Sequence, residues 1–119
     1  MHEFSVVQSL FDTIEAYASD NNAGEVTKVV LKYGLISGIE PCLLKTAFDT
    51  FKEGTIAERA ELQLIPDPLS LKCKSCDTCF EVDRIVFKCT NCGSLNVEVR
   101  NGGELILERL EMECPDDQA

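Results

Sequence analysis

The sequence is poor in positive charge and in histidine, and it lacks a long apolar run. Its 119 residues contain 11 lysines and arginines against 21 aspartates and glutamates, which gives a formal net charge of −10. This charge repels phosphate backbones and anionic lipid surfaces, so neither nucleic acid nor membrane is an expected partner. No apolar run approaches the roughly 18 to 20 residues that cross a bilayer, and the N-terminus lacks the pattern of a signal peptide. We therefore expect a soluble, cytoplasmic protein.

The chain also has little of what catalysis requires. It contains a single histidine, His2. We find no nucleophile that can be placed beside a general base, and no phosphate-binding loop. The sequence therefore favours a carrier or interaction protein and not an enzyme.

Apolar periodicity predicts two helices and three strands. The helices are expected over residues 4–20 and 40–53, with Pro41 in the first turn of the second. Alternating residues predict strands over 26–35, 60–65 and 104–110, of which the last returns to the first sheet. Pro66-Asp67-Pro68 is expected to end the second strand. The residues expected to be buried on the helices are Phe4, Val7, Leu10, Phe11, Ile14, Tyr17 and Ala18 on the first and Leu43, Leu44, Ala47, Phe48 and Phe51 on the second.

Residues 69–99 differ from the rest because they are rich in cysteine and poor in residues that form a core. They contain two Cys-x-x-Cys pairs, Cys73/Cys76 and Cys89/Cys92, separated by twelve residues. Each pair places two sulfurs on one side of a tight turn, so the two turns can complete a tetrahedron around one metal ion. About 30 residues cannot fold on apolar burial alone, so this segment needs such a metal. Short β-like runs are expected near residues 80–82 and 85–87.

Zinc is the expected ion, since it accepts four thiolates in a closed structural site. Iron would also fit, as in a rubredoxin-like electron carrier, but only Phe80 and Phe87 are near enough in sequence to shield it. Because Cys79 forms a further Cys-x-x-Cys with Cys76, it can in principle replace Cys73. We prefer Cys73, which follows Lys72 just as Cys89 follows Lys88. The lone Cys42 and Cys114 are expected to be packing residues or exposed thiols.

The expected fold class is therefore α+β. It comprises a small sheet with two helices, in the order helix-strand-helix-strand plus a returning C-terminal strand, and an inserted zinc-ribbon module. The expected domains are an α/β domain of residues 1–68 and 101–114 and a zinc-ribbon domain of residues 69–100. The N-terminus of the first domain offers a second set of candidate metal donors.

A free α-amine, the His2 imidazole and the backbone nitrogens between them can close adjoining chelate rings in one plane. Planar nitrogen coordination is the preference of Ni(II) and Cu(II), not of zinc. Met1-His2-Glu3 at the start of a helix, residues 34–41 (GLISGIEP) before the second helix, and the four-cysteine ribbon together resemble the HypA family of hydrogenase maturation nickel metallochaperones. The resemblance runs essentially end to end.

This resemblance implies a cytoplasmic protein that binds Ni(II) transiently in the domain of residues 1–68 and 101–114 and assists its insertion into nickel–iron hydrogenase, while Zn(II) is structural. His2 is then the essential nickel ligand, with the Met1 amine and the backbone nitrogens of His2 and Glu3 as further donors. Glu3 is a candidate for partner contact or for tuning the site. Glu40 matches an acidic position of the family and is expected near the nickel.

The implied partners are the GTPase HypB and the large subunit of the hydrogenase. Some members of the family also serve urease, so urease maturation proteins are further candidate partners. The chain itself is expected to be a monomer or a weak homodimer. The alternative function is a structural zinc-ribbon adaptor that delivers no nickel.

Overall fold

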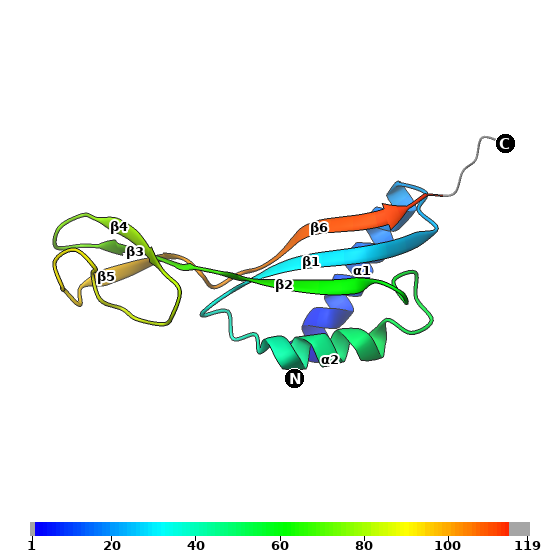
Figure 1. Cartoon of the computed structure of the whole chain (residues 1–119), viewed down its shortest axis with the longest axis horizontal. Coiled ribbons are helices and arrows are strands. Elements are labelled where there is room, and N and C mark those ends of the chain that lie inside the picture. The colour runs from blue at the N-terminus through cyan, green and yellow to red at the C-terminus, as the bar shows by residue number, and fades with distance from the viewer. Residues whose placement is uncertain (1, 115–119) are drawn as a thin grey trace. The chain divides into compact units, whose positions relative to one another are not determined.

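The computed structural model describes residues 2–114, and for His2 and Glu3 it describes the backbone alone. None of the described helices is long and apolar enough to span a membrane. Within these residues the elements follow one another in the order α1 (His2–Asp20), β1 (Glu25–Gly34), α2 (Pro41–Phe51), β2 (Glu61–Asp67), β3 (Leu69–Cys73), β4 (Cys79–Val82), β5 (Val97–Asn101) and β6 (Leu105–Glu113) (Figure 1).

The chain divides into two compact units. The described part of the first unit comprises the chain up to Leu31, residues Glu40–Leu64, and the chain from Leu107 on. The second unit comprises Lys32–Ile39 and Ile65–Ile106. The assignment of nickel binding to residues 1–68 and 101–114 and of zinc binding to residues 69–100 stays a prediction.

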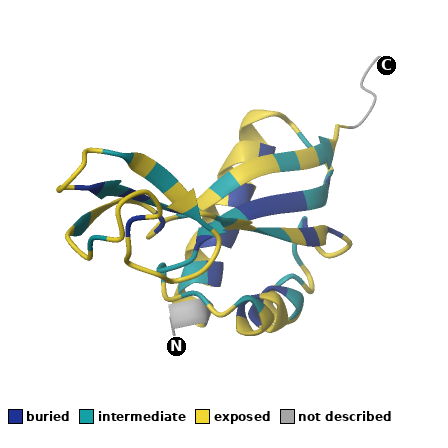
Figure 2. Cartoon of the chain, turned by 60° about the vertical axis from the view of Figure 1, so that its left-hand side comes forward, coloured by how far each residue is buried: buried dark blue, intermediate teal, exposed yellow. Residues whose placement is uncertain are grey.

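The first unit is built from the two helices and a three-stranded sheet with the strand order β2-β1-β6. The last strand therefore returns to lie beside β1, which confirms the α+β arrangement expected from the sequence. The helices pack on each other through the stacked rings of Phe11 and Phe48, whose centroids are 5.2 Å apart. Figure 2 shows the buried residues gathered along β1 and on one side of α2. The core comprises Val7, Leu10, Phe11, Ile14 and Ala18 of α1, Val26, Val29, Val30 and Leu31 of β1, and Leu44, Ala47 and Phe48 of α2.

Four aromatic or aliphatic residues that the helical pattern predicted to be buried are exposed. Phe4 is 47% exposed, Tyr17 51%, Leu43 55% and Phe51 37%. They flank the buried stripes, and a helix buries only the part of its surface that another element covers. Phe4 and Phe51 contact each other at 5.6 Å between ring centroids. The prediction of their burial was therefore wrong.

The second unit contains a three-stranded sheet with the order β4-β3-β5. Both pairings of the central strand are antiparallel, with Leu69 opposite Val82 on one side and Cys73 opposite Val97 on the other. The side chains of Leu69, Leu71 and Cys73 are buried, as expected for alternate positions on one face of β3.

Two expectations about strands were wrong. Residues 85–87 form no strand, and Ile85 and Phe87 are 59% and 43% exposed. The run lies instead in the connection between β4 and β5, where its side chains stay largely uncovered. Strand β2 also continues through Pro66 and ends at Asp67, so only Pro68 separates it from β3.

A close backbone approach occurs between Gly34 and Gly102 in the second unit. The N–H of Gly34 donates to the carbonyl of Glu104 at 2.8 Å, and the N–H of Ile36 donates to the carbonyl of Gly102 at 3.0 Å. A Cβ atom at position 34 would collide with the carbonyl group of Gly102. Position 34 therefore has no room for a side chain, and only glycine fits there.

We predict that Gly34→Ala lowers the free energy of unfolding by about 1–3 kcal/mol or more, because the backbone of residues 102–103 must move. Gly103→Ala is the matched control, since a Cβ there meets no atom within 4 Å. We expect it to change stability by less than about 0.5 kcal/mol. Urea unfolding of both variants with zinc present measures the difference, and equal midpoints would contradict the steric argument.

Candidate metal centre

Four cysteine sulfurs converge in the second unit. The Sγ atoms of Cys73, Cys76, Cys89 and Cys92 all lie within 4.8 Å of one another. The Cys73–Cys92 and Cys76–Cys89 sulfur pairs are 3.6 Å and 3.7 Å apart. Four Zn–S bonds of about 2.3 Å at tetrahedral angles place sulfurs about 3.8 Å apart. The cluster therefore fits one zinc ion held by all four thiolates.

The two cysteine pairs lie on loops of the same backbone geometry. In the first loop the N–H of Asp77 donates to the carbonyl of Cys73, and the N–H of Cys73 donates to the carbonyl of Thr78. In the second loop the N–H of Gly93 donates to the carbonyl of Cys89, and the N–H of Cys89 donates to the carbonyl of Ser94. Asp77 and Gly93 both have positive φ, 59° and 78°, which aspartate and glycine tolerate.

Backbone N–H groups surround the first sulfur of each pair. Cys73 Sγ accepts from the N–H groups of Ser75 and Cys76 at 3.3 and 3.4 Å. Cys89 Sγ accepts from those of Asn91 and Cys92 at the same two distances. Such bonds stabilise the thiolate, which is the form that binds metal.

Thr78 and Asn91 are two functional residues that the sequence analysis missed. The Thr78 hydroxyl lies 3.1 Å from Cys76 Sγ, and Asn91 Nδ2 lies 3.6 Å from the same sulfur. Hydrogen bonds from Thr78, and then from Asn91, lower the pKa of Cys76 to about 6. Cys76 is therefore mostly thiolate at neutral pH. The sequence could have indicated Thr78 by its position, two residues after Cys76. Ser94 occupies the same position after Cys92 in the second loop.

The pKa values of Cys89 and Cys92 shift in opposite directions. The backbone N–H of Cys92 lowers the pKa of Cys89. The N–H of Ser94 lowers the pKa of Cys92, but the neighbouring thiols, beginning with Cys73, and partial desolvation outweigh it and raise this pKa to about 12. Cys92 thus keeps its proton at neutral pH until a metal displaces it. Metal binding releases at least this proton, so the affinity increases as pH rises.

The remaining cysteines lie outside the cluster. Cys79 is exposed at the start of β4, opposite Lys72, and is not one of the four clustered residues. Cys42 and Cys114 are also exposed, and Cys114 Sγ donates to the carbonyl of Asn21 at 3.3 Å. Of the two aromatic residues considered as shields for iron, Phe87 is 43% exposed. This exposure favours zinc over a rubredoxin-like iron centre.

The residues expected to bind nickel belong to the first unit. Met1 lies outside the described residues, while His2 and Glu3 form the first turn of α1. Glu40 is the N-cap of α2, and its Oε1 accepts from the N–H groups of Cys42 and Leu43 at 2.6 and 3.2 Å. Its carboxylate therefore stabilises the start of a helix, whatever else it binds.

Together, the fold and the four-thiol cluster define a small metal-binding protein with a zinc-ribbon module. Over residues 1–112 the chain matches a family described as "Hydrogenase/urease nickel incorporation, metallochaperone, hypA". The chain belongs to this HypA family.

Individual relatives agree with this assignment. The hydrogenase maturation factor HypA of Aquifex aeolicus is 50% identical over 113 residues, which cover 95% of this chain and 98% of the relative. The factor of the same name from Shewanella oneidensis is 42% identical over 117 residues, covering 98% and 99% of the two chains. Both relatives are thus matched along nearly their whole length.

Two solved structures share the fold. The solution structure of the Ni metallochaperone HypA from Helicobacter pylori superimposes with a TM-score of 0.68 at 33% identity, covering 95% of this chain and 98% of that one. A second solution structure, described as HypA protein, gives a TM-score of 0.72 at 34% identity and covers 97% and 98%.

We predict that Cys73→Ser loses zinc and that Cys79→Ser retains one zinc per chain. Loss of a ligand should weaken zinc binding by more than the roughly 10–100-fold that loss of a ligand's hydrogen-bond partner costs. Competition against a colorimetric chelator measures both affinities. If Cys79→Ser instead loses zinc and Cys73→Ser keeps it, Cys79 is the ligand.

For Glu40 we predict that removal of the cap lowers stability. Glu40→Ala should reduce the free energy of unfolding by about 1 kcal/mol, whereas Glu40→Gln should cost less than half of this because its amide oxygen can still accept from Cys42 and Leu43. Thermal unfolding provides the measurement. Equal losses in the two variants would show that charge, and not the hydrogen bonds, stabilises α2; a nickel titration of Glu40→Gln tests the metal role separately.

Proposed function

We propose that this protein is a nickel metallochaperone that binds Ni(II) at its N-terminus and assists its insertion into nickel–iron hydrogenase. The observation that carries the proposal is the family match over residues 1–112, which includes both the N-terminal His2 and the four-cysteine cluster. The zinc ion would be structural, and the nickel ion would be cargo.

The start of α1 supports binding through backbone nitrogens. The first four N–H groups of an α-helix have no partner within the helix. Because α1 begins at His2, the amides of His2 and Glu3 belong to this group. Nickel coordination by these nitrogens would therefore break no hydrogen bond within the helix. The proposed donors are the Met1 amine, the His2 imidazole and these two nitrogens, with Glu3 and Glu40 as further candidates.

Such a site suits a carrier that must release its metal. An α-amine titrates near 8 and an imidazole near 6.5, so protons compete with the metal around neutral pH. Deprotonation of backbone amides adds a further cost and keeps the affinity moderate. Movement of the terminus by a partner would then be enough to transfer the ion.

The proposal includes partners and location. The partner is the GTPase HypB, the recipient is the hydrogenase large subunit, and urease maturation proteins are further candidate partners. We place the protein in the cytoplasm and assign it no enzymatic activity. Nickel binding belongs to the first unit, which contains His2 and Glu40, and zinc binding to the second.

We predict that His2→Ala abolishes stoichiometric nickel binding and leaves zinc content and fold unchanged. The imidazole closes a chelate ring that no other histidine can replace, since His2 is the only one in the sequence. Calorimetry and elemental analysis of untagged protein beginning at Met1 measure both metals.

A variant with extra residues before Met1 is the matched control, because it keeps the imidazole but buries the terminal amine in a peptide bond. Loss of nickel in both variants supports the terminal chelate. Stoichiometric nickel in His2→Ala would refute the site and would favour a zinc-ribbon adaptor.

A further inference from the structure

A groove lies between the second half of α1 and the edge strand β6 of the first unit. It has a volume of about 370 Å³ and is lined by Thr13, Tyr17, Leu107, Glu108, Arg109, Leu110 and Met112. A second hollow of about 470 Å³ shares Thr13 and Tyr17 and extends along α1 past Asp12, Ala16 and Asp20. We call these two hollows together the α1/β6 groove.

The helical side of the groove follows from residue spacing. Asp12, Ala16 and Asp20 are four residues apart and form one row on the surface of α1, while Thr13 and Tyr17 form the neighbouring row. Ala16 leaves room between the two carboxylates. Tyr17, 51% exposed, supplies a large apolar wall. The groove thus has an apolar wall on the helix and carboxylates along its side.

The strand side of the groove is the edge of a sheet. In the order β2-β1-β6, the described residues place no strand beyond β6. An edge strand presents a row of N–H and C=O groups that can pair with another extended segment. Leu107, Leu110 and Met112 add apolar surface beside that edge. Addition of a strand to such an edge is a recurrent mode of peptide recognition.

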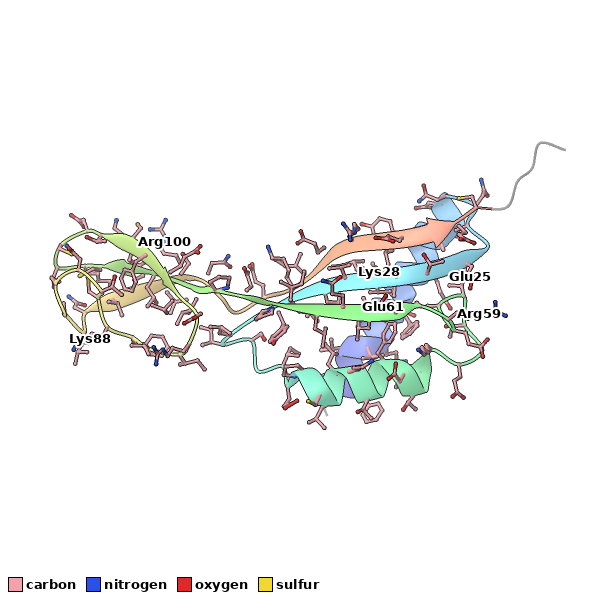
Figure 3. All side chains as sticks on the ribbon, in the orientation of Figure 1. Glu25, Lys28, Arg59, Glu61, Lys88 and Arg100 are labelled. Atoms are coloured by element: carbon pink, nitrogen blue, oxygen red, sulfur yellow. The ribbon has the colours of Figure 1, made fainter. Side chains whose placement is uncertain are left out.

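The charge of this surface selects the occupant. Strand β6 carries Glu108, Glu111 and Glu113 against one basic residue, Arg109, which pairs with Glu111 at 3.1 Å. Seventeen of the 21 acidic residues lie outside residues 69–101, whereas five of the 11 basic residues, including Lys88 and Arg100 in Figure 3, lie within them. A second copy would bring acidic β6 against acidic β6, which is unfavourable. A basic segment would be attracted.

We infer that the α1/β6 groove is a docking surface for a basic, extended segment of a partner protein. The segment adds as a fourth strand at the β6 edge. Its apolar side chains contact Tyr17, Leu110 and Met112, and its lysines or arginines face Asp12 and Asp20. Asp12 lies ten residues after His2, about 15 Å along the helix axis, so this surface is separate from the proposed nickel terminus.

The test uses the full-length zinc-bound protein and a fluorescent peptide of alternating valine and lysine, matched to the 9 residues of β6. A peptide of alternating serine and lysine has the same charge without the apolar face. We expect the valine peptide to bind at least about tenfold more tightly in anisotropy titrations. Hydrogen exchange should slow at β6 amides when it binds, as strand addition requires.

Two charge reversals on α1 form the matched pair of variants. Asp12→Arg places a positive charge in the groove, whereas Glu15→Arg makes the same change outside it. We expect at least about tenfold weaker binding for Asp12→Arg and less than about twofold for Glu15→Arg. Nickel and zinc binding should be unchanged in both, so this test is independent of the proposed function.

Several results would overturn the proposal. Equal weakening by Asp12→Arg and Glu15→Arg, or equal affinity for the two peptides, would mean that only overall charge attracts the peptide. No binding to the wild type would mean that the groove accepts no such segment. A concentration-dependent dimer in sedimentation that Leu110→Arg disrupts would make a second copy the occupant.

Discussion

The four thiols of Cys73, Cys76, Cys89 and Cys92 are the constraint on which the second unit depends. The sheet β4-β3-β5 buries few large side chains besides Leu69 and Leu71, which is too little for a segment of this length to fold alone. Sulfur distances near 3.7 Å match what a single zinc ion requires. The metal thus replaces the missing core, and metal binding becomes folding free energy.

The first unit is stabilised in a different way. Its two helices and β1 bury a conventional apolar core around Phe11 and Phe48, and Glu40 caps the helix that carries Phe48. Such a core needs no metal to fold, so the nickel ion of the proposed N-terminal site could leave without unfolding this unit. The chain thus uses two means of stabilisation: zinc for the second unit and an apolar core for the first. On the proposed function, this difference would let one small chain hold zinc firmly and release nickel.

Stability requires apolar side chains to be buried, whereas docking of a partner requires some of them to stay exposed. Residues such as Tyr17 and Leu110 are apolar yet incompletely covered, and no strand among residues 2–114 pairs with the outer edge of β6. Acidic residues along the same edge discourage pairing with a second copy, in the way that charged residues commonly protect edge strands. An exposed edge with acidic protection remains open to a basic partner. The fold thus combines protection against self-association with a surface for docking.

The sequence by itself predicted the four clustered cysteines, the two helices, the return of the last strand and the family, because cysteine spacing and apolar periodicity can be read directly from the chain. It did not determine which members of a periodic stripe are covered: Phe4, Tyr17 and Leu43 share the spacing of core residues but are 47%, 51% and 55% exposed. Residues 85–87 have strand-like composition, yet they lie in the connection between β4 and β5 and form no strand. The approach of Asn91 to Cys76 likewise required the fold, since Asn91 lies fifteen residues away in sequence. Coverage, pairing and contact between distant residues depend on where other elements lie, and only the tertiary structure decides that.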